Sequence, residues 1–220
     1  MRRSRMVLSV AVLAALAVSP VHAAVTKGRR LKTGQATSYG SGSDGDLQVG
    51  LSRMYKDLGN GVVKDQRTGL FWEKKSDDGS IHDKDDLYTW GQTVIPYAMN
   101  GTMTSFIAAL NTPPCFADFC DWRVPNLEEL ESIRNMDTYA PSAFPAFHAG
   151  CTAGCTVTSC SCTVSSGYWT SSTYQVTPDY AWYASFYAGS AGIDAKASGY
   201  YVRAVRGGSD RKSTRLNSSH

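Results

Sequence analysis

This sequence of 220 residues contains six cysteines, which could form disulfides or bind a metal ion. Cys115 and Cys120 are spaced to close a short loop, and four more lie in a segment rich in Thr, Ser and Gly: Cys151, Cys155, Cys160 and Cys162. Four clustered cysteines could form two disulfides in three alternative pairings, or hold a zinc ion as thiolates. Because the chain begins with the features of an export signal, we predict disulfides, with zinc as the less favoured alternative.

Histidine chemistry has few candidates. His22 lies in the expected signal and His220 in the extreme C-terminal tail, which leaves His82 and His148. Neither has an evident nucleophile beside it, and the sequence contains neither a G-x-S-x-G elbow nor an H-E-x-x-H zinc motif. We therefore predict that the chain is not an enzyme.

An acidic segment, SDDGSIHDKDD at residues 76–86, is the candidate metal site. Asp77, Asp78, Asp83 and Asp85, with Asp86 beside them, offer the hard oxygen ligands that calcium prefers. Their spacing does not follow the calcium loop of helix-loop-helix proteins, and charge runs usually face water. We expect a solvated turn and no required cofactor, with calcium as the alternative.

The N-terminus has the pattern of a secretory signal. Arg2, Arg3 and Arg5 precede an apolar run at residues 6–18, and Val21-His22-Ala23 places small residues before a cleavage point. We expect cleavage after Ala23 and export to the periplasm, the cell surface or the medium. No later stretch is apolar enough to cross a membrane, so we expect no transmembrane segment in the mature chain.

Residues 210–220 read DRKSTRLNSSH, which equals the translation of a common sequencing adapter. We interpret this segment as an assembly artefact and exclude it from fold and function. The whole chain has a net charge of +3, but the signal contributes three arginines and the tail a net charge of +2, which leaves −2 for the mature part. We therefore expect no nucleic-acid partner.

Residues 51–208 are expected to form one domain after an extended lead-in at residues 24–50. Strands are predicted at residues 53–57, 62–65 and 70–74, joined by tight turns at 58–61 and 67–69. A helix is predicted from a cap at Thr102 or Thr104 to Asn111. A second helix follows Asn126, whose side chain can form a capping box with Glu129.

A long irregular loop is expected at residues 136–167, and the chain should end in strands at 167–171, 180–187 and 200–206. Strands, two helices, a loop and further strands predict an α+β domain with a mostly antiparallel sheet. The aromatic residues Trp72, Trp122, Trp169, Trp182 and Phe186 are expected in its core.

Polar and aromatic residues that alternate away from this core set are the candidate ligand contacts. Exposed tyrosines offer a flat apolar face and a hydroxyl, which suit sugars or protein surfaces. The predicted binding residues are Tyr174, Gln175, Asp179, Tyr180, Tyr183, Ser185 and Tyr187, with Asp194 and Tyr200 as further candidates. An anion could be bound through hydrogen bonds by Arg123, Arg203 and Arg206, but we favour a structural role for all three.

Five segments occur in an order that resembles a known bacterial family. They are TGLFWEK (68–74), CDWRVPNLEEL (120–130), YWTSS (168–172), AWYASFYAG (181–189) and YVRAVRGG (201–208). This set resembles the Lcl C-terminal domain, a domain of unknown function named after the end of a collagen-like adhesin. The resemblance implies a C-type-lectin-like fold, related in shape to formylglycine-generating enzymes, and a binding role outside the cytoplasm.

In that adhesin the domain is associated with trimers and with sulfated glycans, but this chain lacks the collagen repeats that accompany the domain there. Our leading hypothesis is an exported binding module for a glycan or surface protein, acting in adhesion or at the cell envelope. The alternatives are a structural protein that assembles as a homo-oligomer, and a divergent relative of the formylglycine-generating oxidases, which would need free thiols.

Overall fold

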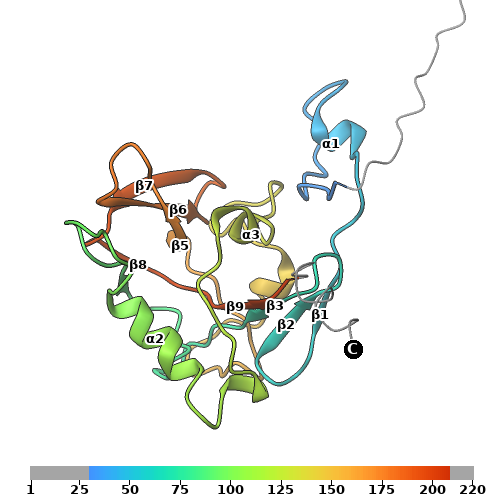
Figure 1. Ribbon diagram of the computed structural model, residues 1–220. Helices are drawn as coiled ribbons and strands as arrows, with labels where there is room; N and C mark the ends of the chain where they lie inside the picture. The colour runs from blue at the N-terminus through green and yellow to red at the C-terminus, as the bar shows by residue number, and fades with distance from the viewer. Residues whose placement is uncertain (1–29, 209–220) are drawn as a thin grey trace, which may run out of the picture.

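The computed structural model describes residues 30–208, and Figure 1 shows its arrangement. The expected signal peptide and the adapter-like tail lie outside the described residues. Antiparallel strands form three small sheets, which helices and disulfide-bonded loops surround. The predicted α+β class with mostly antiparallel pairing is confirmed.

The first sheet is the predicted meander. It contains β1 (Tyr55–Asp57), β2 (Val62–Asp65), β3 (Leu70–Glu73) and β9 (Val205–Gly207), in that order. Gly59 and Gly61 both have positive φ in the β1–β2 turn, as the Leu-Gly-Asn-Gly sequence predicts. The buried carboxylate of Asp65 accepts the backbone N–H groups of Arg67 and Thr68, which fixes the β2–β3 turn.

The third sheet contains β5 (Gly167–Thr173), β6 (Tyr180–Ser185) and β7 (Ala191–Ala195), and it lies at the upper left of Figure 1. Between the two larger sheets, β4 (Tyr88–Thr89) pairs with β8 (Gly199–Tyr200). The strands β5 and β6 confirm their predictions, although β6 ends two residues early. The sequence did not predict β7, whose Ala and Gly residues have low strand propensity.

The predicted strand at residues 200–206 is wrong as a single element. It is divided into β8 and β9, which belong to different sheets. Residues 201–204 cross the interior between them, with Val202, Arg203 and Ala204 all buried. The segment is buried on every side, and its backbone bonds to β5 and β3 instead of continuing one ladder.

Two α-helices cover the sheets, and three shorter helices lie in loops. These are α2 (Thr102–Leu110), α3 (Leu127–Glu131), α1 (Asp44–Leu47), η1 (Phe116–Asp118) and η2 (Pro145–Phe147). The capping box of α3 is confirmed, because Asn126 accepts from the Glu129 N–H and Glu129 accepts from the Asn126 N–H. The predicted threonine cap of α2 is wrong: its N-cap is Gly101, and the Thr102 hydroxyl accepts from the Thr89 N–H instead.

The buried side chains form two clusters. One lies under α2 and contains Trp90, Phe106, Trp122 and Trp169. The other lies under α3. Its large members are Trp72, Leu130, Phe147, Tyr168 and Phe186. The predicted core positions of Trp72, Trp122, Trp169 and Phe186 are confirmed. No helix in the described part is long and apolar enough to span a membrane.

A buried charged network around Glu73 joins β3 to the acidic loop and to the C-terminal segment at residues 201–204. Glu73 is fully buried, and its Oε1 lies 3.3 Å from Lys75 Nζ and 2.8 Å from His82 Nδ1. Its Oε2 accepts the Ala204 N–H at 2.9 Å. Burial alone would raise the pKa of Glu73, but Lys75, His82 and the Ala204 N–H outweigh it and hold this pKa below its usual range.

The lowered pKa makes a prediction about acid stability. A carboxyl group whose pKa is lower in the folded state stabilises the fold above its unfolded pKa of about 4.3, and loses that contribution as the pH falls through the folded pKa. Glu73→Gln should therefore cost about 3 kcal/mol or more at neutral pH and make stability fall less steeply with acid below about pH 5. Urea unfolding across pH 3–7 measures both effects. The exposed Glu128→Gln should match the wild type, and equal acid slopes in wild type and Glu73→Gln would contradict this account.

Candidate binding surface

All six cysteines form disulfides, as predicted. The pairs are Cys115–Cys120, Cys151–Cys162 and Cys155–Cys160. No free cysteine remains in the described part of the chain, where all six lie, so the zinc alternative has no thiolate ligands. The oxidase alternative likewise lacks the free thiols that it requires.

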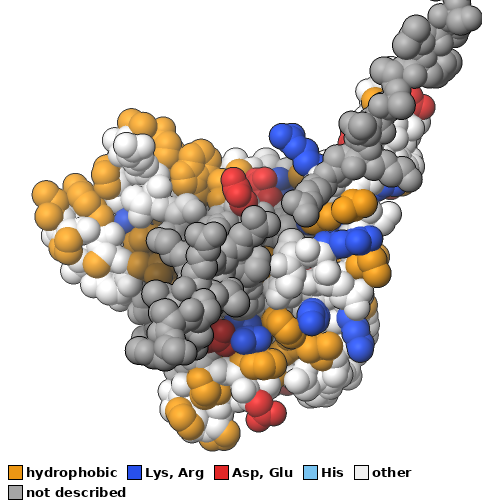
Figure 2. All heavy atoms as spheres, turned by 45° about the vertical axis from the view of Figure 1, so that its right-hand side comes forward, with side chains coloured by type: hydrophobic (Ala, Val, Ile, Leu, Met, Phe, Trp, Pro, Cys, Tyr) orange, Lys and Arg blue, Asp and Glu red, His pale blue; other side chains and the backbone are white. Residues whose placement is uncertain are grey.

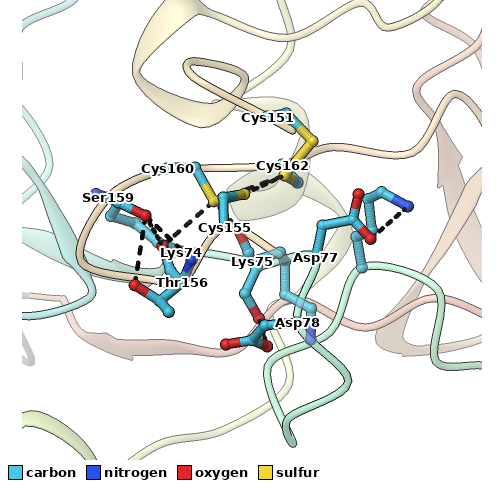
Figure 3. The surroundings of a disulfide bond; sticks show 12 residues. Lys74, Lys75, Asp77, Asp78, Cys151, Cys155, Thr156, Ser159, Cys160 and Cys162 are labelled. Carbon is cyan, nitrogen blue, oxygen red and sulfur yellow. Dashed lines mark hydrogen bonds and ion pairs between the residues drawn. A yellow bond between two sulfur atoms is a disulfide. The ribbon is translucent and has the colours of Figure 1, made fainter. Parts of the chain in front are cut away.

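The two disulfides of the long loop lie side by side in Figure 3, with the sulfurs of Cys155 and Cys162 separated by 3.7 Å. Their loop bonds to the strand extension after β3, because Cys162 N donates to Lys75 O and Asp77 N donates to Cys155 O. The disulfides therefore hold residues 75–77 against the domain, at the point where the acidic loop begins.

Three of the four candidate metal ligands come together in that loop. Carboxylate oxygens of Asp77, Asp83 and Asp85 lie within 4.8 Å of one another. Lys84 Nζ already lies 3.3 Å from Asp77 and 2.6 Å from Asp85. Asp83 accepts the N–H groups of Gly79 and Asp85, so a cation would have to displace Lys84 to bind here. Asp78 is not part of this group, and it accepts from Ser76 and Ser80.

The remaining titratable candidates make contacts within the domain. The His82 ring packs on Phe116 with centroids 4.2 Å apart, and His148 Nδ1 accepts the Thr163 N–H. Arg203 is buried and donates to the carbonyls of Glu73 and Cys162.

Arg123 and Arg206 each bind a carboxylate of this chain through two nitrogens. Arg123 donates to both Glu129 oxygens, at 2.7 and 2.6 Å, and Arg206 donates to both Asp121 oxygens. A cavity of about 570 Å³ lies beside Arg123 and Glu129. Because each guanidinium is matched to a carboxylate, these contacts support the structural role that we favoured.

The predicted ligand residues do not form one surface. Tyr174 and Tyr180 lie at one end of β6, where Tyr174 N donates to Tyr180 O. Tyr187 lies past the other end, about 20 Å along the strand direction, where its carbonyl accepts the Ala140 N–H. Ser185 is also at that end, and its hydroxyl accepts the Tyr187 N–H. Gln175 and Asp179 belong to the β5–β6 connection near Tyr180.

Tyr183 lies on the face of the sheet that packs against the core. Its ring stacks on Tyr200 at a centroid distance of 4.6 Å and an interplanar angle of 16°, and it meets the edge of buried Trp169. Tyr200 donates from its hydroxyl to Asp194 Oδ2 at 2.8 Å. These contacts make Tyr183 and Tyr200 half-buried lining of the first core.

Two glycines permit this stack. A Cβ added to Gly192 would lie 2.5 Å from the Tyr183 ring and hydroxyl, and one added to Gly167 would lie 2.4 Å from the Tyr200 ring. Any side chain at either position would therefore push a ring off the sheet.

The opposite face of the same sheet carries a second, half-buried aromatic group. Trp182 and its cross-strand partner Ile193 share this face, and Tyr174 meets the Trp182 ring edge-on at 5.5 Å. Trp182 is only half-buried and belongs to neither core cluster, so its predicted core position is wrong. Helix α3 packs against β5 and β6 in the cluster that contains Tyr168 and Ala184, and Trp182 lies outside this cluster.

We name Tyr174, Tyr180, Trp182 and Ile193 the aromatic end of the sheet. Hydrophobic side chains gather at the left of Figure 2, the side on which the third sheet lies. The nearby cation Lys196 is fully buried, with its Nζ 3.9 Å from the Trp90 ring centroid and bonded to Tyr97 O. Asp179, in the β5–β6 connection, supplies a neighbouring carboxylate, whereas Asp194 follows Ile193 and lies on the Tyr183 face, where it is bonded to Tyr200. The surface is therefore apolar with one acidic neighbour.

The glycine positions give a prediction. Gly192→Ala should displace the Tyr183 ring and destabilise the fold by about 1–3 kcal/mol, because the packed ring must leave its position. Thermal unfolding and near-ultraviolet circular dichroism measure the loss of stability and of aromatic packing. Gly199→Ala is the matched control, since its added Cβ would approach Leu87 no closer than 3.6 Å. An unchanged aromatic spectrum for Gly192→Ala would refute the stacked arrangement.

Comparison with known proteins gives one match. The family model of the Lcl C-terminal domain matches residues 61–206, which is more than half of the chain and includes every strand from β2 to β8. No curated protein and no solved structure matches the sequence. The matched region contains both core clusters and the aromatic end of the sheet. The chain belongs to the Lcl C-terminal domain family.

Proposed function

We propose that this chain is an exported binding module with a lectin-like fold, and that the aromatic end of its third sheet binds a glycan. One observation carries the proposal. Trp182, Tyr174 and Ile193 lie together on one face of the third sheet, outside both core clusters, and Ile193 is exposed. Aromatic side chains are enriched at binding surfaces because they combine a large apolar area with a hydrogen-bonding group.

The chemistry of this surface favours an uncharged saccharide. A ring face such as that of Trp182 can pack on the C–H groups of a sugar, and the hydroxyls of Tyr174 and Tyr180 can bond to its oxygens. Asp179 can accept hydrogen bonds from sugar hydroxyls and would repel sulfate groups. The preferred ligand should therefore differ from the sulfated glycans that the family resemblance implies.

Three disulfides support the proposed location, since such bonds persist in oxidising compartments outside the cytoplasm. Adhesion or binding at the cell envelope is the role that fits this location.

A glycan array with neutral and sulfated saccharides tests the proposal, using protein that begins at Ala24. We expect saturable binding to neutral glycans, and a loss of at least about tenfold in affinity for Trp182→Ala, since burying a tryptophan face contributes more than about 1.4 kcal/mol. Tyr139→Ala is the matched control, because Tyr139 is 78% exposed on a different loop. Addition of a chelator tests whether calcium at the acidic loop takes part.

Absence of binding to every glycan, with and without calcium, would reject the saccharide proposal. Concentration-dependent association that Trp182→Ala abolishes would instead assign the aromatic end to self-assembly. Equal losses for Trp182→Ala and Tyr139→Ala would show that the effect is not specific to this surface.

A further inference from the structure

A second cavity system lies at the opposite side of the domain, between the lead-in and the first sheet. Residues 30–52 contact the domain, because the carboxylate of Asp137 accepts the N–H groups of Ala36 and Thr37 and Met136 N donates to Thr33 O. Within the segment, Leu31 bridges to Leu51. Two cavities of about 390 and 440 Å³ open along this junction, and they share Lys32, Gln48 and Ser52 as lining residues. We call the pair the junction cleft.

Three cations line the junction cleft: Lys32, Arg53 and Arg67. Each is held in place through a neutral oxygen. Lys32 Nζ donates to Gln48 Oε1, Arg53 Nε donates to Lys32 O, and Arg67 Nε donates to Ser52 O. Within residues 30–208, none of the three forms an ion pair with a carboxylate.

Two acidic residues of this region, Asp44 and Asp65, are already engaged. Asp65 bonds to the backbone of Arg67 and Thr68 and to the Thr68 hydroxyl. Asp44 accepts from the Thr33 hydroxyl. Arg123, Arg134 and Arg206 are instead paired with acids of this chain. Three fixed cations without acidic partners therefore set this cleft apart.

Arg53 has unused hydrogen-bonding capacity. Its Nη1 is buried and has no partner among the described residues. A buried donor without a partner costs free energy, which a ligand oxygen can recover. The same cavity has an apolar wall of Tyr55, Phe144, Pro145 and Ala146, and the Arg53 guanidinium lies 5.9 Å from the Phe144 ring centroid.

We propose that the junction cleft binds a small organic oxyanion, with its phosphate or carboxylate group between Lys32, Arg53 and Arg67 and its apolar part against Tyr55 and Phe144. Figure 2 shows Lys and Arg side chains gathered on this side of the molecule, away from the aromatic end. Lys32, Gln48 and Arg53 precede the residues that the family model matches, so the cleft depends on the lead-in of this chain. The site is independent of the proposed glycan surface.

Calorimetric titration at fixed ionic strength tests the site with phenyl phosphate, benzoate and inorganic phosphate. We expect saturable binding of at least one aryl anion, and weaker binding of inorganic phosphate because it lacks the apolar part. Arg53→Gln and Arg67→Gln should each weaken binding at least about tenfold, as expected when a charge-assisted hydrogen bond is lost. A preference for phenyl phosphate or for benzoate identifies the anionic group.

Lys56→Gln is the matched control, since Lys56 is an exposed cation of β1 that does not line the cleft. The affinity of the Lys56→Gln variant for each anion should equal that of the wild type. Arg67 is exposed, so Arg67→Gln keeps the test valid even if Arg53→Gln fails to fold. Absence of saturable binding for all three anions would overturn the proposal. An equal loss in Lys56→Gln would also overturn it, because only the net charge would then matter.

Discussion

The burial of Glu73 is the constraint on which most of this structure depends. A carboxylate with no exposed surface requires compensating charge and hydrogen bonds, and these come from Lys75, His82 and the backbone of Ala204. The carbonyl of the same residue accepts from buried Arg203. A single residue of β3 therefore fixes the acidic loop on one side and the C-terminal crossing segment on the other.

The disulfide loop completes this arrangement. Arg203 also donates to Cys162 O and to the Thr163 hydroxyl, and Cys162 N donates to Lys75 O. The crossing segment is thus anchored directly after it leaves β8, where Tyr200 pairs with Tyr88 and stacks on Tyr183. That stack covers one face of the third sheet near Tyr183. Trp182 lies on the opposite face, so the interior network indirectly determines which aromatic residue of β6 stays outside the core clusters.

Local patterns in the sequence predict local structure well here. The glycine turns of the meander and the capping box at Asn126 depend on neighbours in the chain, and both are found. All six cysteines form disulfides as predicted, but the pairing of the four clustered ones, which the sequence left open, is given only by the fold. The faces of β6 depend on distant residues. Alternation separates Trp182 from Tyr183, but only Tyr200, Gly167 and Gly192 determine that Tyr183 is the covered one. The junction cleft could not be predicted from the sequence for the same reason, because Lys32 and Arg67 line one cavity only when the lead-in is folded against the domain.

Acrylamide quenching of tryptophan fluorescence tests the central claim, that the Trp182 face receives the ligand, most directly. Four of the five tryptophans are buried, with Trp122 and Trp90 at 2% and 3% exposure and Trp72 and Trp169 at 0%. Trp182 should therefore supply nearly all of the quenchable emission, and a saturating glycan should protect that emission from acrylamide. Glycan binding that leaves the quenching unchanged would place the ligand elsewhere and contradict the account.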